Sequence, residues 1–392
     1  MMQPTADVVV IGAGVVGCST AYHLAQMGIP DVAVVEMGEV GSGSSSKSAS
    51  MLSLQFCHDE LSVRMAKYSY TQYMEFEEEF GTPIDFKRIG WLSLATAESA
   101  EGLRRNAERL QSLDVRTEIL QPEEVKQRYP EINTQDLVLG TWGPDDGPFD
   151  PHMIMWGYIK RASQIGVRLY QGVRATGIEV RHGQVEGVYT DSGFVSTKAV
   201  VNAGGPWAVE IGRWVGLEIP IINLARSIWV TKPLPDIPSS RPFVEDLTAE
   251  WYYRPEGSGI LMGMGTIPTE ALDVEMSQSL LNEMIDVATH RIPVLERASV
   301  LTSWTGIRPV TLDDHPILGP APYVKGFFLN CGWGGAGIIQ APIAGQLVAE
   351  YISKGRTETM DIGSLGIERF EGESVEEARD LWERSRLKVM KH

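Results

Sequence analysis

The sequence has few cysteines and no long hydrophobic run. Its three cysteines, Cys18, Cys57 and Cys331, are an odd number and form no Cys-x-x-Cys pair. A disulfide framework and a cysteine-rich zinc site are therefore disfavoured, and a reducing compartment is expected. No stretch reaches the roughly 18 uninterrupted apolar residues of a membrane span. The N-terminus also has no basic leader before its apolar run. These absences predict a cytoplasmic protein with no signal peptide and no transmembrane segment.

Basic residues are also scarce. The chain has 34 Lys+Arg against 51 Asp+Glu, which gives a net charge of −17. Proteins that bind nucleic acid need a basic surface for the phosphates, so we expect no nucleic-acid partner, tRNA included. No His, Asp and Glu cluster has metal-ligand spacing, and no GxSxG elbow is present, so neither a metal site nor a serine nucleophile is expected. With 392 residues, 43% of them hydrophobic, the chain should form two or more folded domains.

Glycine, in contrast, is abundant and clustered, with 40 residues. The N-terminal run DVVVIGAGVVG places Gly12, Gly14 and Gly17 after a short β-branched strand and before a helical pattern. In this context the first glycine makes the tight turn, the second lets a pyrophosphate approach the backbone, and the third permits close helix–strand packing. The helix N-terminus then faces the phosphates with its partial positive charge. The motif predicts a dinucleotide site, with a glycine turn kept for packing as the alternative.

The second predicted strand, VAVVE, ends at Glu36, where a carboxylate would accept hydrogen bonds from an adenosine ribose. This charge would repel a ribose phosphate, so FAD or NAD fits better than NADP. The later strands are interrupted by long insertions and are completed only near the C-terminus, which favours FAD. The run GSGSSSKSAS follows, and its hydroxyls and the Lys47 ammonium would lie along the pyrophosphate. A solvated polar loop is the alternative interpretation of this run.

Five motifs in this order resemble the D-amino-acid oxidase superfamily of FAD-dependent amine and amino-acid oxidoreductases. They are DVVVIGAGVVG with Glu36, KAVVNAGGPWA, YYRPEG, GIRPVTLDDHPILGPAP and GFFLNCGWGGAGIIQAPIAGQLVAEYI. The resemblance covers nearly the whole chain. Within the superfamily, the sequence is most similar to sarcosine oxidase beta subunits, glycine oxidase and dye-linked L-proline dehydrogenases.

The resemblance implies an α/β fold with two parts. The first is a Rossmann-type FAD-binding domain formed by residues 1–80, 145–215 and 305–392. The second is a substrate-binding domain of α+β character, with a discontinuous antiparallel sheet, formed by residues 81–144 and 216–304. A Glu-rich C-terminal segment has apolar residues at helical spacing over 375–382. It predicts either a docking helix or a helix folded back on its own domain.

The resemblance also assigns the cofactor residues. The NAGGPW turn would approach the flavin, a backbone segment at Val173 would contact the adenine, and the GWGGAGIIQ turn would place a helix N-terminus beside the isoalloxazine. Ser42 to Ser50 includes neither histidine nor cysteine, so we expect non-covalent FAD. The predicted cofactor-binding residues are Gly12, Gly14, Val15, Val16, Gly17, Glu36, Ser44, Ser45, Lys47, Ser50, Met51, Leu52, Val173, Ala203, Gly204, Trp207, Gly334, Gly335, Ala336, Gly337, Ile338 and Ile339.

Four residues are candidates for the chemistry. A substrate carboxylate beside a flavin calls for a cation that binds it in two places, and the resemblance assigns this role to Arg308. The resemblance also implies that a tyrosine of the YYRPEG strand completes the clamp, with ordinary core or edge aromatics as the alternative. Strand alternation places only one of Tyr252 and Tyr253 inside. Spacing to Pro255 favours Tyr252. His315 is a candidate base, with packing or capping near the flavin as the alternative.

The predicted function is oxidation of a small amino acid at its C–N bond to the imine. The resemblance favours a secondary amine such as L-proline or sarcosine. Because no lysine can be assigned to oxygen activation, we expect an electron acceptor other than oxygen. Two alternatives stay open: a flavin-carrying subunit of a hetero-oligomeric amine oxidase or dehydrogenase, and a glycine or D-amino-acid oxidase. Either a homo- or a hetero-oligomer is compatible with the sequence.

Overall fold

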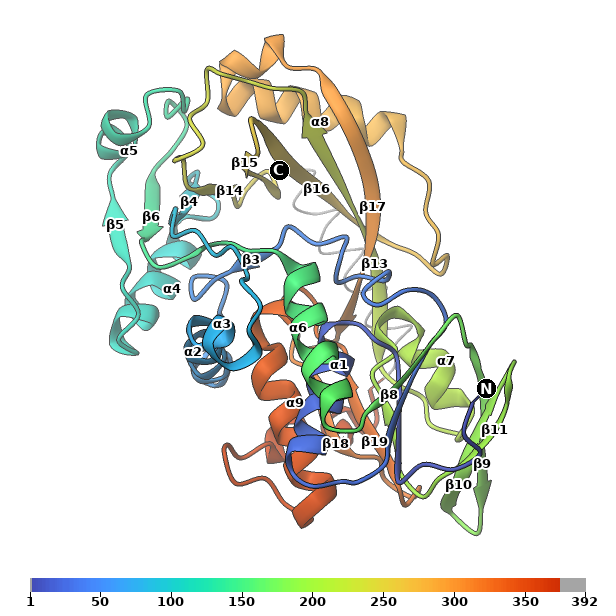
Figure 1. Cartoon of the computed structure of the whole chain (residues 1–392). Coiled ribbons are helices and arrows are strands. Elements are labelled where there is room, and N and C mark those ends of the chain that lie inside the picture. The colour runs from blue at the N-terminus through green and yellow to red at the C-terminus, as the bar shows by residue number, and fades with distance from the viewer. Residues whose placement is uncertain (1, 374–392) are drawn as a thin grey trace.

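The computed structural model describes residues 2–373, so the predicted helix over residues 375–382 lies outside the described residues. Figure 1 shows two regions, one built around a mainly parallel sheet with α1, α6 and α9 and the other around a larger sheet with α8. The helices are α1 (Val15–Gln26), α2 (Glu60–Met74), α3 (Phe76–Phe80), α4 (Ala100–Ser112), α5 (Pro122–Arg128), α6 (Pro151–Gln164), α7 (Ala208–Arg213), α8 (Gln278–Arg291) and α9 (Gly337–Lys354), with short 3-10 helices at Gly205–Trp207, Pro293–Arg297, Gly363–Leu365 and Ile367–Phe370.

The first sheet has the strand order β18-β19-β12-β1-β2-β8. Its strands are β1 (Val8–Ile11), β2 (Val32–Glu36), β8 (Arg168–Gln171), β12 (Val200–Asn202), β18 (Ile317–Pro320) and β19 (Phe327–Cys331). All neighbours pair in parallel except β18, which runs antiparallel to β19 at one edge. The apolar, β-branched character of β1 and β2 suits strands that are buried on both faces.

The second sheet has the order β17-β13-β16-β15-β14-β4-β6-β5. Its strands are β4 (Trp91–Ala95), β5 (Glu118–Leu120), β6 (Leu139–Gly143), β13 (Ile221–Thr231), β14 (Phe243–Asp246), β15 (Trp251–Glu256), β16 (Gly259–Pro268) and β17 (Val300–Thr311). Every pair is antiparallel except β14 with β4. Helix α8 covers one face (Figure 1) and buries Leu280 and Met284 against it.

Two smaller sheets complete the fold. One joins β9 (Ala175–Arg181), β10 (Gln184–Thr190) and β11 (Gly193–Ser196), and the other pairs β3 (Met51–Leu52) with β7 (Gly147–Pro148). The alternating pattern after residue 167 predicts one antiparallel meander, but its first strand, β8, joins the parallel sheet beside β2. The FAD-binding domain is predicted to resume at residue 305, yet β17 stays paired with β13 as far as Thr311. The rest of the domain division stays a prediction.

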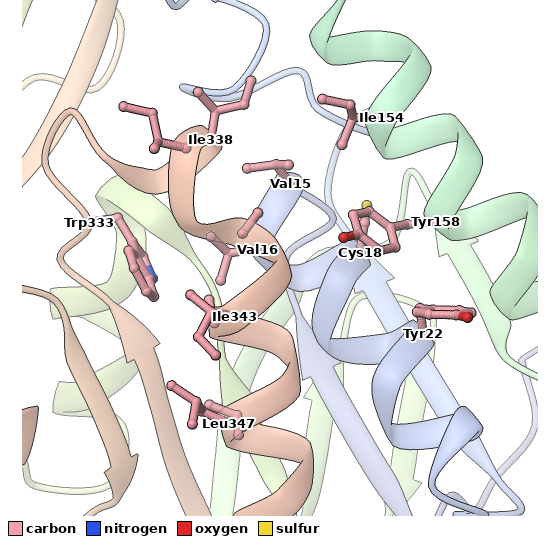
Figure 2. Packing of buried hydrophobic residues seen from close by; sticks show 14 of the residues in the cluster. Val15, Val16, Cys18, Tyr22, Ile154, Tyr158, Trp333, Ile338, Ile343 and Leu347 are labelled. Atoms are coloured by element: carbon pink, nitrogen blue, oxygen red, sulfur yellow. The ribbon is translucent and has the colours of Figure 1, made fainter. Parts of the chain in front are cut away.

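The largest core cluster lies between the first sheet and its helices. Figure 2 shows apolar side chains of α1, α6 and α9 meeting in this cluster. Tyr22 of α1 and Tyr158 of α6 have ring centroids 5.7 Å apart. Gly345 lets α9 pack closely against α1, because a Cβ at this position would lie 2.3 Å from the Ser19 side chain of α1. This packing fixes the N-termini of α1 and α9, which both border the candidate site.

Candidate active site

A cavity of about 560 Å³ extends from the end of β1 to the inner face of the second sheet. Two of the four candidates for the chemistry and most predicted cofactor residues border it. The predicted residues that line the cavity are Gly12, Gly14, Val15, Val16, Glu36, Ser44, Ser45, Lys47, Ser50, Met51, Ala203, Gly204, Trp207, Tyr252, Arg308, Gly334, Gly335, Gly337, Ile338 and Ile339. The structure therefore brings together one continuous site from segments distant in the sequence.

The glycine loop lies at one end of this cavity. Gly12 has φ +105°, and a Cβ there would lie 2.5 Å from the carbonyl oxygen of Ala203. Gly17 does not line the cavity. A Cβ at Gly17 would lie 2.0 Å from the carbonyl oxygen of Gly12, so this glycine permits close packing of α1 on β1. Helix α1 begins at Val15 without a side-chain cap from Gly14, which leaves its N-terminus directed at the cavity.

Glu36 at the end of β2 connects the loop to the second strand. Its Oε2 accepts a hydrogen bond of 2.7 Å from the amide of Ala13, and its Oε1 accepts one of 2.8 Å from the amide of Gly38. Each carboxylate oxygen has a further lone pair. The side chain borders the cavity, where these acceptors can meet the hydroxyls of a ribose.

The serine-rich segment connects the two sheets. Ser45 Oγ accepts a 3.0 Å hydrogen bond from the amide of Val15 at the start of α1. On the other side, Trp304 Nε1 donates to the carbonyl of Lys47 at 3.2 Å, and Arg254 Nε donates to the carbonyl of Ala49 at 2.7 Å. The segment is thus a structured wall of the cavity.

These residues fit an FAD molecule. Gly12 and Gly14, the N-terminus of α1 and the hydroxyls of the serine-rich segment surround the position expected for a diphosphate. Glu36 would supply ribose acceptors, and the cavity lining continues to the N-terminus of α9, beside which the remainder of the dinucleotide would lie. The residues that would hold it are those of the glycine loop, Glu36, the serine-rich segment and the turn before α9.

The second sheet forms the wall at the other end. Strand alternation places Glu245, Tyr252, Arg226 and Arg308 on its cavity-facing side, because these residues share a face across β14, β15, β13 and β17. Three aromatic rings lie beside them. Phe243 stacks on Trp91 with 3.8 Å between ring centroids and on Tyr252 with 5.2 Å. The ring centroids of Phe56 and Trp91 are 6.1 Å apart.

Arg308 projects from β17 beside the turn that precedes α9. Its guanidinium carbon lies 5.7 Å from the Phe56 ring centre, and a Cβ at Gly335 would lie 2.3 Å from its Nη2. Within residues 2–373 its guanidinium makes no hydrogen bond or ion pair. Burial lowers the pKa of Arg308, and the charge of Arg226 lowers it further. An anion in the cavity would relieve both effects.

The structure decides between the two tyrosines. Tyr252 lines the cavity, with its ring 4.9 Å below the Arg226 guanidinium and directly over Gly263. Tyr253 points to the opposite face of the sheet, where it is fully buried among apolar side chains. The prediction that included Tyr253 is corrected, because neighbouring residues of a strand face opposite sides of the sheet.

The prediction of His315 as a candidate base is also corrected, because this residue does not line the cavity. Its Nε2 pairs with Asp59 Oδ2 at 2.8 Å, and its Nδ1 lies 2.9 Å from the carbonyl of Asp313. The hydrogen bond to Asp59 raises the pKa of His315 to about 9. The histidine therefore ties the turn after β17 to Asp59, the N-cap of α2.

Three further predicted cofactor residues lie near the cavity without lining it. Leu52 is fully buried in the core, and Ala336 precedes α9 as its N-cap. The amide of Val173 donates to the carbonyl of Glu36 at 3.0 Å, while the next two residues, Arg174 and Ala175, form the wall. The contact between the Val173 backbone and the adenine stays a prediction.

Sequence reasoning missed Arg226, Glu245, Trp91, Phe243 and Phe56. For the two charged residues, the available signal was a charged side chain within an apolar strand pattern, as in NLARSIWV and PFVEDL. This signal does not say which strands are neighbours. Arg226 donates to Thr266 Oγ1 at 3.0 Å and to the carbonyl of Glu250 at 3.2 Å.

The chain is similar to several known proteins. It is 30% identical to the mitochondrial sarcosine dehydrogenase of Mus musculus over 98% of this chain, but it spans only 43% of that longer protein. It is 29% identical to the sarcosine oxidase subunit beta of Rhodobacter capsulatus over 95% of this chain and 90% of the relative. Among solved structures, L-proline dehydrogenase from P. horikoshii superposes with a TM-score of 0.86 at 30% identity, covering 94% of this chain and 99% of the other.

The family described as FAD dependent oxidoreductase (DAO) matches residues 7–351. This range includes both sheets and every cavity-lining residue discussed above. The mixed fold agrees with the predicted α/β class. The chain therefore belongs to the DAO family of FAD dependent oxidoreductases, and FAD is its expected cofactor.

Proposed function

We propose that this chain catalyses the FAD-dependent oxidation of a small amino acid at its C–N bond to the imine. The observation that carries the proposal is Arg308, a guanidinium that borders the cavity without an ionic partner among residues 2–373. A substrate carboxylate is the anion that fits this guanidinium, because it can accept two parallel hydrogen bonds from it. Tyr252 on the same wall can donate a further hydrogen bond.

The residues around the clamp position the substrate. Bound FAD would supply the acceptor for the hydride equivalent that leaves the carbon beside the nitrogen. Arg308 and Tyr252 hold the carboxylate, which fixes the orientation of that carbon. Phe56, Trp91 and Phe243 form an apolar surface that excludes water and suits a small aliphatic or cyclic side chain.

The finer proposal is a secondary amine such as L-proline or sarcosine, with an acceptor other than oxygen. It is supported by the names of the relatives, which are dehydrogenases of L-proline and of sarcosine. Binding of FAD without a covalent link also stays a proposal. No helix within residues 2–373 is long and apolar enough to cross a membrane. The cytoplasmic location stays a prediction.

A second candidate is a flavin-carrying subunit whose electron acceptor lies on a partner chain. A relative of nearly equal length is named as a beta subunit, and this observation favours the idea. Reduction of an artificial dye by the isolated chain would support an autonomous dehydrogenase. Activity that appears only after a partner is added would support the subunit. Rapid turnover with oxygen and glycine or D-alanine would support an oxidase instead.

The test is an anaerobic absorbance titration of the purified holoprotein with L-proline, sarcosine, D-alanine and glycine. We expect one of them to bleach the oxidised flavin band. In Arg308→Met, the substrate concentration that bleaches half of the flavin should be at least about tenfold higher, because a hydrogen bond to a charged group contributes about 1.5–3 kcal/mol. Arg104→Met, at an exposed position on α4, is the matched control. Absence of bleaching by every amine, or equal effects of the two variants, would contradict the proposal.

A further inference from the structure

Glu245, on the wall of the cavity that the second sheet forms, has no role in the function proposed above. Glu245 lies on β14, directly opposite Tyr252 of β15 and beside Ser93 of β4. It borders the cavity, and its Oε2 accepts a weak hydrogen bond from Ser93 Oγ at 3.5 Å. Ser93 in turn accepts a 3.0 Å hydrogen bond from Trp91 Nε1. The wall therefore orients the carboxylate while leaving lone pairs available for a ligand.

The groups that face Glu245 come from three other strands of the same sheet, of which only β15 is adjacent to β14. Arg226 of β13 and Arg308 of β17 are positive, and Tyr252 of β15 contributes a phenol. From β4 the carboxylate meets only Ser93 and Trp91, which are uncharged. Glu250 also borders the cavity. Arg226 is already hydrogen-bonded to Thr266 and to the backbone of Glu250, whereas Arg308 is the guanidinium available to a ligand.

This arrangement presents a cation and an anion on one wall. An α-amino acid carries its carboxylate and its ammonium group on neighbouring atoms of one short unit, with opposite charges. When Arg308 holds the carboxylate, the ammonium needs an acceptor within the cavity. Glu245 faces the same cavity from the same sheet, with β15, β16 and β13 between its strand and that of Arg308, and each of the two charges shifts the pKa of the other. Burial raises the pKa of Glu245 above its usual value, against the lowering effect of Arg226 and Arg308. The carboxylate is thus a better proton acceptor than an exposed glutamate.

We propose that Glu245 binds the amino group of the substrate and accepts a proton from it before oxidation. The inference rests on the proposed function, because it names the group that recognises the amine. In this step one N–H bond breaks, one O–H bond forms on Glu245, and no electrons are transferred to another molecule. The nitrogen regains its lone pair, which is required for the neighbouring carbon to lose a hydride equivalent. Arg308 holds the carboxylate throughout.

The test compares Glu245→Gln, Glu245→Asp and Glu283→Gln in the holoprotein. Glu283 is an exposed residue of α8 and serves as the control. The first readout is the rate of anaerobic flavin reduction as a function of pH. At neutral pH we expect Glu245→Gln to be at least tenfold slower than wild type. Its deficit should shrink at alkaline pH, where solvent deprotonates the amine. Glu245→Asp should recover part of the rate.

The second readout is binding, which needs no turnover. L-Proline and tetrahydro-2-furoate share a ring and a carboxylate, but the second has an ether oxygen where the first has an ammonium group. Isothermal titration calorimetry of the dithionite-reduced holoprotein under anaerobic conditions reports both affinities, because a reduced flavin cannot oxidise the amine. We expect Glu245→Gln to lose affinity for L-proline at least tenfold and to bind tetrahydro-2-furoate as wild type does. Glu283→Gln should change neither affinity.

The outcomes separate the two proposals. If no amine reduces the flavin but Glu245→Gln still loses the preference for L-proline, the proposed oxidation is wrong and the recognition of the ammonium group stands. A rate deficit that is constant with pH, or an equal loss of both ligands, would overturn the proposed role of Glu245. An unchanged pH profile in Glu245→Gln would overturn it as well.

Discussion

At the scale of single residues, two neighbouring tyrosines on β15 lie in different environments. Tyr252 is turned toward the cavity, and Tyr253 is fully buried with a hydroxyl that has no hydrogen-bond partner among the described residues. A buried polar group without a partner destabilises the fold by its desolvation cost, so its removal can stabilise a protein. The pair therefore offers a matched comparison on one strand.

We expect Tyr253→Phe to leave substrate affinity unchanged and to raise the free energy of unfolding by up to about 1 kcal/mol. Tyr252→Phe should weaken carboxylate binding about two- to tenfold, since a neutral hydrogen bond contributes about 0.5–1.5 kcal/mol. Ligand titration and denaturant unfolding of both variants measure these effects. The reverse result, with Tyr253→Phe impairing binding and Tyr252→Phe silent, would show that the assigned faces are wrong.

Gly12 is the second position where one residue controls the site. Its φ is +105°, and a Cβ there would lie 2.5 Å from the Ala203 carbonyl oxygen, so the backbone conformation and the surroundings both exclude a side chain. We expect Gly12→Ala to lower the free energy of unfolding by about 1–3 kcal/mol or more and to abolish FAD retention. Gly102→Ala is the control, because this exposed glycine of α4 has open space around it and should gain about 0.5–1 kcal/mol. Retention of FAD by Gly12→Ala would contradict the prediction.

At the scale of elements, the pair between His315 and Asp59 connects the turn after β17 to the start of α2. Burial alone would raise the pKa of Asp59, but the hydrogen bonds from His315 and Ser62 lower it below its usual range. Because the pKa of His315 is higher in the folded chain than in the unfolded chain, its ion pair contributes its full stabilisation below the unfolded pKa, about 6.5. It is then lost as pH rises through about 9. For Asp59, stabilisation is lost as pH falls below about 4.

We therefore expect wild type to exceed His315→Gln in stability by up to about 1 kcal/mol near pH 6, with the difference shrinking by pH 10. Asp59→Asn keeps an N-cap residue and should remove the same pH dependence. Denaturant unfolding at several pH values measures the difference. His152→Gln, at an exposed position on α6, is the control. A difference that stays constant between pH 6 and pH 10 would contradict the ion pair.

At the scale of the whole molecule, the cavity lies between two sheets whose strands come from distant segments. FAD would contact the glycine loop, the serine-rich segment and the turn before α9, so its binding couples these segments to global stability. The glycine loop and Glu36 are expected to hold the adenosine diphosphate half of the molecule.

In the apoprotein, FAD at about 100 times its Kd should stabilise the fold by about 2.7 kcal/mol. ADP should also stabilise it, because ADP carries the ribose and diphosphate groups that Glu36 and the loop are expected to bind. FMN lacks the adenosine part and should stabilise less than ADP. Thermal unfolding with each ligand tests this. Stabilisation by FMN without any by ADP would place the adenosine site elsewhere.

Much of the cofactor end could be predicted from the sequence, because its signals are local. A strand, the Gly12-x-Gly14 turn and a helix are neighbours along the chain, and Glu36 follows within the same βαβ unit. The sequence also indicated that only one of the two tyrosines faces the cavity, because alternation along one strand places Tyr252 and Tyr253 on opposite faces. Which face borders the cavity depended on the neighbouring strands.

The sequence by itself determined the dinucleotide loop, and its resemblance to a known superfamily supplied the α/β class and Arg308 as a candidate. Tertiary structure alone decided which residues form the proposed substrate end of the cavity. Glu245, Tyr252 and Arg308 share one face only because β14, β15 and β17 belong to one sheet in a particular order and register. The same packing removed His315 from the site by pairing it with Asp59. Residues far apart in sequence carry no local signal of their contact, because strand pairing is set by burial and hydrogen bonding across the whole fold.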